Sequence, residues 1–359
     1  MAATTIDFAP LTTPSTPDEI AAYKAEVKAS GVAWATWNPS QIIGVVMVVP
    51  VVFAVLAIGG GFATFVVSMA AQADSAPALI APALFFLGFL AFLAFVVVKA
   101  VGSFGKRWDL WVRMNRFARA NGMTFSPFDA NPSYPGAIFQ TGDSRQAIDH
   151  LVSSSGRFFD FGNFRYSTGS GKNRSTHTWG FLAFNLDRKL PNMVLDSRAN
   201  NGFWGTNLPA TFDKSQILSL EGDFDQYFTL YCPKEYERDA LYVFTPDLMA
   251  LLIDEAAPFD VEIVDDWMFV YSSVAFTTGD ANLYARLFRI IDTVGAKALT
   301  QTDRYVDARI GDFSANVIAP EGARLKRGVS AGAIVLGVVF VALWIWGILG
   351  DGLYAFFGN

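Results

Sequence analysis

The sequence has few of the residues from which chemical sites are usually built. It contains two histidines and one cysteine in 359 residues, so neither a disulfide framework nor a cysteine–histidine zinc site can form within the chain. Cys232 lies in a strand-like run and is most simply a small buried hydrophobic residue. We therefore expect no catalytic residue, no cofactor and no metal ion.

Charged residues are missing from three long stretches. Hydrophobic residues make up 52 % of the chain and the mean hydropathy is +0.31, which is high for a soluble protein. Residues 41–73, 75–98 and 329–350 contain no charged side chain. Because a helix needs about 20 apolar residues to cross a bilayer, we expect transmembrane helices in these three ranges. The first run is too long to be the core of a cleavable signal peptide.

Basic residues are absent from the short segment between the first two runs, which holds only Asp74. They gather after the second run and before the third, at Lys99, Lys106, Arg107, Arg113, Arg116, Arg119, Arg324, Lys326 and Arg327. The positive-inside rule then places residues 1–40 and 103–328 in the cytoplasm, and the tail 351–359 outside. This predicts a multi-pass protein of the cell membrane. Because no ionisable residue lies within the runs, we interpret them as an anchor rather than a transport path.

The N-terminal segment consists of a stretch rich in threonine, proline and alanine, followed by a motif that begins a helix. Residues 1–16 are rich in threonine, proline and alanine, and we expect them to be disordered. The motif Thr16-Pro17-Asp18-Glu19 supplies an N-cap, a proline at the first helical position and the glutamate of a capping box. It predicts a short helix to about Ser30, with Gly31 as its stop.

A basic helix that carries tryptophans is expected over residues 103–122, directly after the second apolar run. Its candidate lipid-interface residues are Lys106, Arg107, Trp108, Trp111, Arg113 and Arg116. Basic and indole side chains beside a membrane suit the headgroup region, so we predict contact with membrane lipids, anionic ones included. The alternative, that these residues are topology determinants with no lipid preference, stays open.

The pattern of residues 123–328 is typical of a domain built on a β-sheet. Strand-like runs lie at 137–140, 158–166, 179–186, 193–195, 224–232, 259–264 and 267–271. Helices are expected at 144–152, from Thr245-Pro246 to before Pro258, and from Asp280 onward. Hairpin spacing with few helices predicts an α+β fold. We expect an antiparallel-sheet cytosolic domain, anchored by two transmembrane helices before it and one after it.

The stretch YSTGSGKNRST, residues 166–176, is similar at first sight to a phosphate-binding loop. That loop needs a glycine five positions before its Gly-Lys pair and a serine or threonine after it. Here Tyr166 and Asn173 occupy those positions, and strand-like runs lie on both sides. Glycine, serine and asparagine are residues that hairpin loops use. The pattern predicts a hairpin tip.

Other chemical candidates have simpler explanations. His150 is expected on the surface of the helix at 144–152, and nothing like a nucleophile elbow surrounds a serine near His177. The acid pairs Asp223/Asp225 and Asp265/Asp266 are explained by turns and strand ends, since no EF-hand spacing accompanies them.

Charge divides unevenly along the second part of the chain. Residues 99–198 hold 14 basic and 7 acidic side chains, whereas residues 200–322 hold 8 basic and 20 acidic ones. A nucleic-acid-binding domain presents a coherent basic face, so the acidic half argues against nucleic acid. The acidic half predicts a solvated surface, or a surface for a basic protein partner.

Six short motifs in order carry a family resemblance. They are FARANGM (117–123), PGAIFQTG (135–142), FGNF (161–164), WGFLAF (179–184), LPNMVLD (190–196) and FTPDL (244–248). With them, most of 105–310 and the paired runs before it resemble an uncharacterised family of bacterial, especially actinobacterial, membrane proteins with a cytosolic domain of unknown function. The resemblance implies membrane anchoring and supplies no catalytic residue.

These observations predict a membrane-anchored cytosolic binding or scaffolding domain that is not an enzyme. Its expected partners are membrane lipids and an unidentified protein, without nucleic acid, and its oligomeric state stays open. The alternative is a membrane-proximal enzyme that uses carboxylates and the polar loop 167–176, and a third possibility is a subunit of a transport or envelope complex. A deep pocket where several titratable side chains converge would favour the enzyme.

Overall fold

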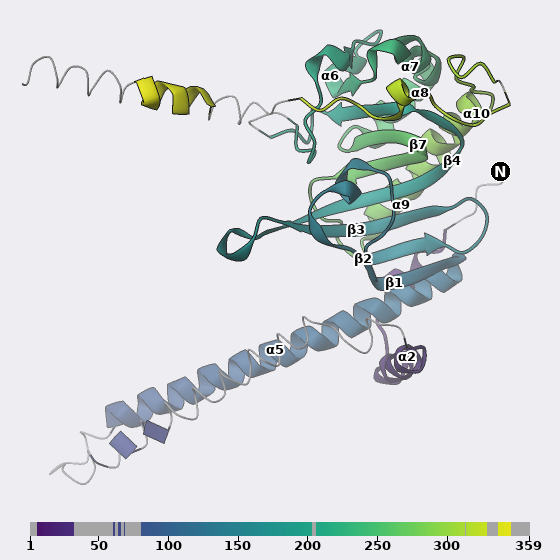
Figure 1. Ribbon diagram of the computed structural model, residues 1–359. Helices are drawn as coiled ribbons and strands as arrows, with labels where there is room; N and C mark the ends of the chain where they lie inside the picture. Colours follow the sequence, from purple (N-terminus) through teal and green to yellow (C-terminus); the bar gives the residue numbers. More distant parts are fainter. Residues whose placement is uncertain are drawn as a thin grey trace, which may run out of the picture. The chain divides into compact units, whose positions relative to one another are not determined.

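The computed structural model in Figure 1 describes residues 6–31, 60–61, 64–65, 68, 80–202, 206–312, 314–328 and 337–345. The chain divides into two compact units. One consists of Met1–Phe8 and Phe117–Asn359, and the other of Ala9–Arg116.

The smaller unit is helical. It contains α1 (Ala9–Thr12), α2 (Pro17–Ala29) and most of α5 (Ile80–Ala120). The capping box at α2 is confirmed, because Thr16 Oγ1 accepts from the Glu19 N–H at 3.2 Å and Glu19 Oε2 accepts from the Thr16 N–H at 2.7 Å. The short helix α1 lies in a segment that we predicted to be disordered. The predicted basic helix forms the end of α5, which stops at Ala120.

The predicted three-span anchor is wrong for this structure. No helix in the described part of the chain has both the length and the apolar character that a membrane crossing requires. The predicted span 75–98 overlaps α5 from residue 80, and 329–350 enters the described residues only at 337–345. The span 41–73 and the tail 351–359 lie almost wholly outside them. Without the anchor, the predicted multi-pass placement in the cell membrane is not supported either.

The larger unit is built on one antiparallel sheet of seven strands (Figure 1). The strands are β1 (Met123–Ala130), β2 (Asp143–Ser153), β3 (Phe159–Thr168), β4 (Ser175–Ser197), β5 (Ile217–Leu218), β6 (Phe228–Tyr231) and β7 (Asp260–Ser272). Their order is β1-β2-β3-β4-β6-β5, and β7 pairs with β4 off this path. A sheet of this kind with helices packed against it is consistent with the expected α+β class.

Strand β4 organises the sheet because it is long enough to take three partners. Its first part pairs with β3, its last residues pair with β6, and β7 runs along most of it. The predicted strands 179–186 and 193–195 are therefore parts of one strand. Strands 259–264 and 267–271 likewise join as β7, so the turn predicted at Asp265-Asp266 is wrong. Asp265 adopts φ 53° at an irregularity in the ladder, and a bulge uses the same left-handed residues as a turn.

Both faces of the sheet are covered by aromatic cores. Phe161 and Phe164 of β3 are three positions apart and point to opposite faces. Phe161 contacts Tyr284 and Phe288 of α9 (Ala281–Ile290) at ring-centroid distances of 5.2 and 5.5 Å. Phe164 lies 4.5 Å from Phe139. The sheet is thus an interior layer, and its polar buried groups are confined between packed side chains.

Phe139 belongs to a 3₁₀ turn, η2 (Ala137–Gln140), and not to the strand predicted there. The turn forms because its first N–H is taken by a buried carboxylate, Oε2 of Glu262, at 2.7 Å. Phe139 then fills the centre of the core on that face, which includes Phe181, Phe269 and Tyr271.

The helix predicted at 144–152 is also wrong, because these residues form β2. Asp149 takes φ 49° where the pairing with β3 is irregular, and this interrupts the alternation expected of a strand. His150, expected on the surface, is 4 % exposed. Its Nδ1 lies 2.9 Å from Oδ1 of Asp160.

The remaining short helices and turns lie between the strands or follow β7, the last strand along the chain. They are η3 (Gly171–Asn173), η4 (Lys214–Gln216), α6 (Phe224–Tyr227), η5 (Lys234–Tyr236), α7 (Glu237–Val243), α8 (Pro246–Leu251), η6 (Leu252–Ala256), η7 (Ile291–Gly295), α10 (Ala296–Thr302) and α11 (Pro320–Ala323). The predicted helices from Thr245-Pro246 and from Asp280 are confirmed. The predicted strand 224–232 is half right, since α6 precedes β6 there.

Candidate functional site

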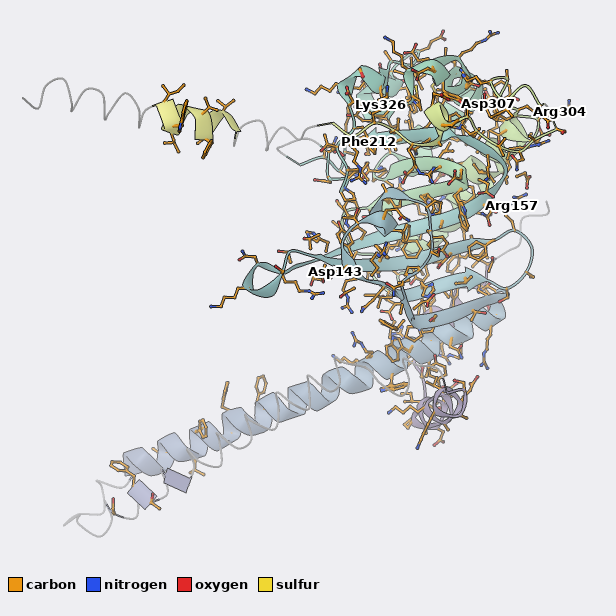
Figure 2. All side chains as sticks on the ribbon, in the orientation of Figure 1. Asp143, Arg157, Phe212, Arg304, Asp307 and Lys326 are labelled. Atoms are coloured by element: carbon orange, nitrogen blue, oxygen red, sulfur yellow. The ribbon has the colours of Figure 1, made fainter. Side chains whose placement is uncertain are left out.

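A cleft of about 840 Å³ opens between α7 and the loop 303–309 of the larger unit. Its lining residues are Arg238, Asp239, Tyr242, Arg304, Tyr305, Val306, Ala308 and Arg309. Arg304 and Asp307 mark the loop in Figure 2. Three guanidinium groups and one carboxylate line this cleft, so its net charge is positive although the surrounding half of the chain is acidic.

Helix α7 presents two of the lining side chains together. Arg238 and Tyr242 are four positions apart and therefore lie on one face of the helix. Arg238 is exposed, and Tyr242 is 43 % exposed. The opposite face of the helix buries Ala240 and Val243 completely. Packing on one face thus fixes the direction in which the cleft residues point.

The loop 303–309 is held in place by one buried carboxylate. Asp307 is 1 % exposed. Its Oδ2 accepts from the Tyr236 hydroxyl at 2.6 Å and from the Ala319 N–H at 2.9 Å, and its Oδ1 accepts from the Arg309 N–H at 3.0 Å. Burial alone would raise the pKa of Asp307, but these donors outweigh burial and lower it. Asp307 is therefore an ionised anchor for the loop.

Arg309 and Tyr305 form the internally satisfied floor of the cleft. The Arg309 guanidinium lies 3.8 Å from the Tyr236 ring centroid and 3.2 Å from Oδ2 of Asp239. Tyr305 donates its hydroxyl to Oδ1 of the same Asp239 at 2.8 Å. Burial, reinforced by Asp239, raises the pKa of Tyr305. The phenol is therefore neutral, and these side chains hold one another in fixed positions.

The rim of the cleft keeps two cations with little internal compensation. The Arg304 side chain is 90 % exposed, and its Nε lies 4.0 Å from Asp303. Arg238 forms no ion pair with any residue that the structure describes. The exposed Tyr242 ring lies 6.2 Å from that of Tyr305. Arginine forks with tyrosine rings suit the recognition of carboxylate groups.

This site was not predicted from the sequence. Arg238 and Arg304 lie on different elements and far apart in the chain. The region around them has a net negative charge, so counting charges along the sequence gives no sign of a basic site there. The one local signal was the spacing of Arg238 and Tyr242 on a short helix, which by itself indicates nothing about a site.

The residues predicted to contact lipid lie in the smaller unit, where several of them make internal contacts. Trp108 packs against Tyr23 and Trp111, at ring-centroid distances of 6.3 and 5.2 Å. The Lys24 ammonium lies 5.0 Å from the Trp108 ring, and the Arg107 guanidinium lies 5.7 Å from the Trp111 ring. The two indoles therefore hold the N-terminal helix α2 against α5.

Two of the predicted lipid-facing arginines already have partners in the smaller unit. Arg113 Nε donates to Asp109 at 3.1 Å, and its Nη1 donates to the carbonyl oxygen of Leu11 at 2.6 Å. Arg116 Nη1 donates to Oε1 of Glu19 at 3.2 Å. These guanidinium groups position the N-terminal segment on α5.

Lys106 and Arg107 are exposed, and they are the predicted residues best placed to meet an external anion. Contact with lipid stays a prediction.

The loop 167–176 is a hairpin tip, as predicted. Thr168 pairs with Ser175 across β3 and β4, and Arg174 Nη2 lies 2.8 Å from Asp143. Thr168 Oγ1 lies 2.8 Å from Nε2 of His177. The loop thus joins two antiparallel strands, whereas a phosphate-binding loop must open a helix.

Comparison with known proteins adds little to this description. No family model matches the chain, and no curated protein matches it either. A similar solved structure is the crystal structure of the mycobacterial trehalose monomycolate transport factor A, TtfA. The match has a TM-score of 0.36 and 12 % sequence identity, and it covers 54 % of this chain and 94 % of that chain. A likeness at this TM-score carries no argument about fold or function, and the resemblance to a bacterial membrane-protein family stays a prediction.

Proposed function

We propose that the chain is a binding protein whose cleft at α7 and loop 303–309 receives an acidic segment of a partner protein. The observation that carries the proposal is a pair of exposed, weakly compensated arginines, Arg238 and Arg304, that line one cleft together with the exposed Tyr242. Arginine and tyrosine are among the residues most enriched at the energetic centres of protein interfaces.

The charge states within the cleft favour binding over catalysis. A general acid or base works best with a pKa near the operating pH. The pKa of Tyr305 is raised, and the pKa of Arg309 is also raised, because Asp239 and Asp307 outweigh the lowering effect of burial. These groups keep one charge state across neutral pH, and Asp239 is already shared between two donors. The titratable side chains of the floor therefore support a rigid surface.

The expected affinity contribution is modest because the rim is open to solvent. An exposed ion pair contributes about 0.2–1 kcal/mol, so two arginine contacts contribute about 0.4–2 kcal/mol together. Since about 1.4 kcal/mol corresponds to a tenfold change, loss of both contacts should weaken binding about twofold to thirtyfold.

The test uses two fluorescein-labelled peptides and the full chain. One peptide is rich in Glu and Asp and contains one Tyr, and the other has the same sequence with Gln and Asn in place of the acids. The acidic peptide should bind, and more weakly as salt is added. Arg238→Gln with Arg304→Gln should weaken it as stated above. The matched control, Lys172→Gln with Lys214→Gln, removes two exposed charges outside the cleft and should leave binding unchanged. Equal binding of the two peptides, or an equal loss in the control, would refute the proposal.

A further inference from the structure

The end of β4 and the beginning of β7 bring two aspartates together in the interior of the larger unit. Leu195 of β4 pairs with Val261 of β7, so the next pair along this antiparallel ladder is Asp196 with Asp260. Side chains at facing positions lie on the same face, with Cβ atoms about 4.5–5.5 Å apart. Asp260 is 0 % exposed and Asp196 is 4 % exposed.

Four buried oxygens at this place lack hydrogen-bond donors. Oδ1 of Asp260 accepts from the Ser197 N–H at 2.8 Å, but its Oδ2 receives no donor from any residue that the structure describes. The same holds for Oδ1 of Asp196 and for the amide oxygens of Asn200 and Asn201, in the segment that follows β4. Buried polar atoms are normally paired, so four exceptions on two aspartates and the two asparagines that interact with them call for a physical explanation.

The electrostatics show that these groups act on one another. The pKa of Asp260 is raised to about 7, chiefly by burial and also by the nearby charge of Asp196, although hydrogen bonds from the Ser197 N–H and the Asn200 side chain oppose the rise. Burial also raises the pKa of Asp196, although hydrogen bonds from the Thr206 and Asn201 side chains oppose this rise. Asn200 is thus a hydrogen-bond partner of Asp260 and Asn201 one of Asp196, and the charge of Asp196 acts on Asp260.

The protein supplies little positive charge near the carboxylates of Asp196 and Asp260. Arg198 lowers the pKa of Asp196, yet it makes no ion pair with either aspartate within the described part of the chain. Two neighbouring carboxylates that are buried without a counter-charge repel each other and favour a bound cation or a shared proton.

We propose that Asp196, Asp260, Asn200 and Asn201 form a binding site for Ca²⁺ or a cation of similar hardness. The donor set consists of carboxylate and amide oxygens, which Ca²⁺ prefers, and it contains neither the nitrogen nor the sulfur ligands typical of zinc. Two carboxylates balance the charge of one divalent ion. No metal ion was expected from the sequence, because the chain has few histidines and cysteines and the acid pairs considered lack EF-hand spacing. Asp196 and Asp260 lie far apart along the chain, so no local pattern joins them.

The size of the donor set limits the affinity. Among the described residues no group of three His, Cys, Asp or Glu side chains is placed to hold a metal, so this site depends on two carboxylates completed by amide oxygens and water. A bound ion would tie the segment after β4 to the start of β7. Its main effect would be to stabilise that end of the sheet.

The first experiment measures thermal unfolding of the full chain, after treatment with a chelator, as Ca²⁺ is added. The Tm should rise with Ca²⁺ concentration, by about 5–10 °C at a hundredfold excess over Kd. Asp260→Asn keeps the side-chain size and removes one buried charge. This variant should be at least as stable as the parent without Ca²⁺ and should lose the Ca²⁺-dependent rise. Asp312→Asn, an exposed aspartate elsewhere, should respond like the parent.

The second experiment uses Tb³⁺ as a luminescent probe and does not depend on the stability of one variant. Asp196 pairs with Thr229 of β6, and Tyr231 lies two positions along the same face of that strand, a diagonal neighbour at about 7–8 Å, so this tyrosine should sensitise bound Tb³⁺. Emission should saturate in the parent, fall when Ca²⁺ is added, and weaken severalfold in Asn201→Ala. Unchanged Tm and unsensitised Tb³⁺ in the parent, or equal responses in parent and Asp260→Asn, would overturn the site. A Tm that rises only with acid would assign the carboxylates a shared proton instead.

Discussion

Gly136 occupies a position where a side chain has no room, and its replacement gives the sharpest test of the aromatic core. The φ of −64° and ψ of 155° at this residue lie in the extended region that any residue adopts, so alanine brings no backbone strain. Its Cβ, however, would lie 2.1 Å from the Tyr271 hydroxyl oxygen and 3.0 Å from two ring atoms of Phe269. The hydroxyl must therefore move.

Movement of that hydroxyl breaks a buried hydrogen bond. Tyr271 donates to Oε2 of the buried Glu262 at 2.8 Å, and the same oxygen accepts from the Ala137 N–H at 2.7 Å. Overpacking costs about 1–3 kcal/mol, and loss of a buried hydrogen bond costs about 1–3 kcal/mol. Gly136→Ala should then lower the free energy of unfolding by about 2–6 kcal/mol. Tyr271→Phe, which loses only the bond, should lower it by about 1–3 kcal/mol.

The double variant decides whether the two residues act through this hydroxyl. The protein with both Gly136→Ala and Tyr271→Phe loses the Tyr271–Glu262 hydrogen bond only once, and it has no hydroxyl for the new Cβ to clash with. The close contact of that Cβ with the Phe269 ring remains. Its destabilisation should be smaller than the sum of the single changes by at least about 1 kcal/mol. Urea unfolding followed by tryptophan fluorescence measures the difference. Tyr227→Phe, at a tyrosine that is 36 % exposed, should change stability by less than about 0.5 kcal/mol. Additive effects would show that the clash and the hydrogen bond are not coupled.

Three further predictions concern other parts of the chain. With a chelator present, the free energy of unfolding should fall as pH rises from about 4 to about 7. The reason is that the pKa of Asp260 is about 7 in the folded protein, so the native state keeps the proton of Asp260 to a higher pH than the unfolded state does. Asp260→Asn should flatten this fall, as measured by urea unfolding at a series of pH values. Cys232 is fully buried and burial raises its pKa to about 12, so Ellman's reagent should react at the rate of unfolding, and rapid reaction in the native state would contradict this burial. Thr16→Ala should destabilise α2 by about 0.5–2 kcal/mol and speed tryptic cleavage at Lys24, whereas Thr16→Ser should not, because the Glu19 N–H keeps its acceptor.

The features that could be predicted from the sequence depend on neighbours within about four residues. Thr16 and Glu19 cap α2 through hydrogen bonds that span three positions. Asp280 caps α9 through the N–H groups of Asn282 and Leu283. Such contacts need no partner from elsewhere in the chain, so residue type and spacing were enough to place them.

Predictions failed where a distant element decided the conformation. Residues 144–152 have no clean alternation because Asp149 takes a left-handed conformation, yet pairing with β1 and β3 on both sides makes them a strand. The turn at Ala137–Gln140 exists because the carboxylate of Glu262, distant in sequence, accepts its first N–H. The three-span anchor rested on three uncharged runs, and no helix in the described part of the chain has the length and apolar character of a membrane crossing.

By itself, the sequence determined the chain's apolar stretches, its charge asymmetry, the helix caps and the hairpin tip at 167–176. Tertiary structure alone brought Arg238 and Arg304 to one cleft, and paired Asp196 with Asp260 across two strands. The physical reason is that charge and hydrogen bonding depend on distance in space. In the sheet, the neighbours of a residue in space depend on the pairing of β4 with β3, β6 and β7. This pairing in turn depends on side-chain packing across the whole sheet.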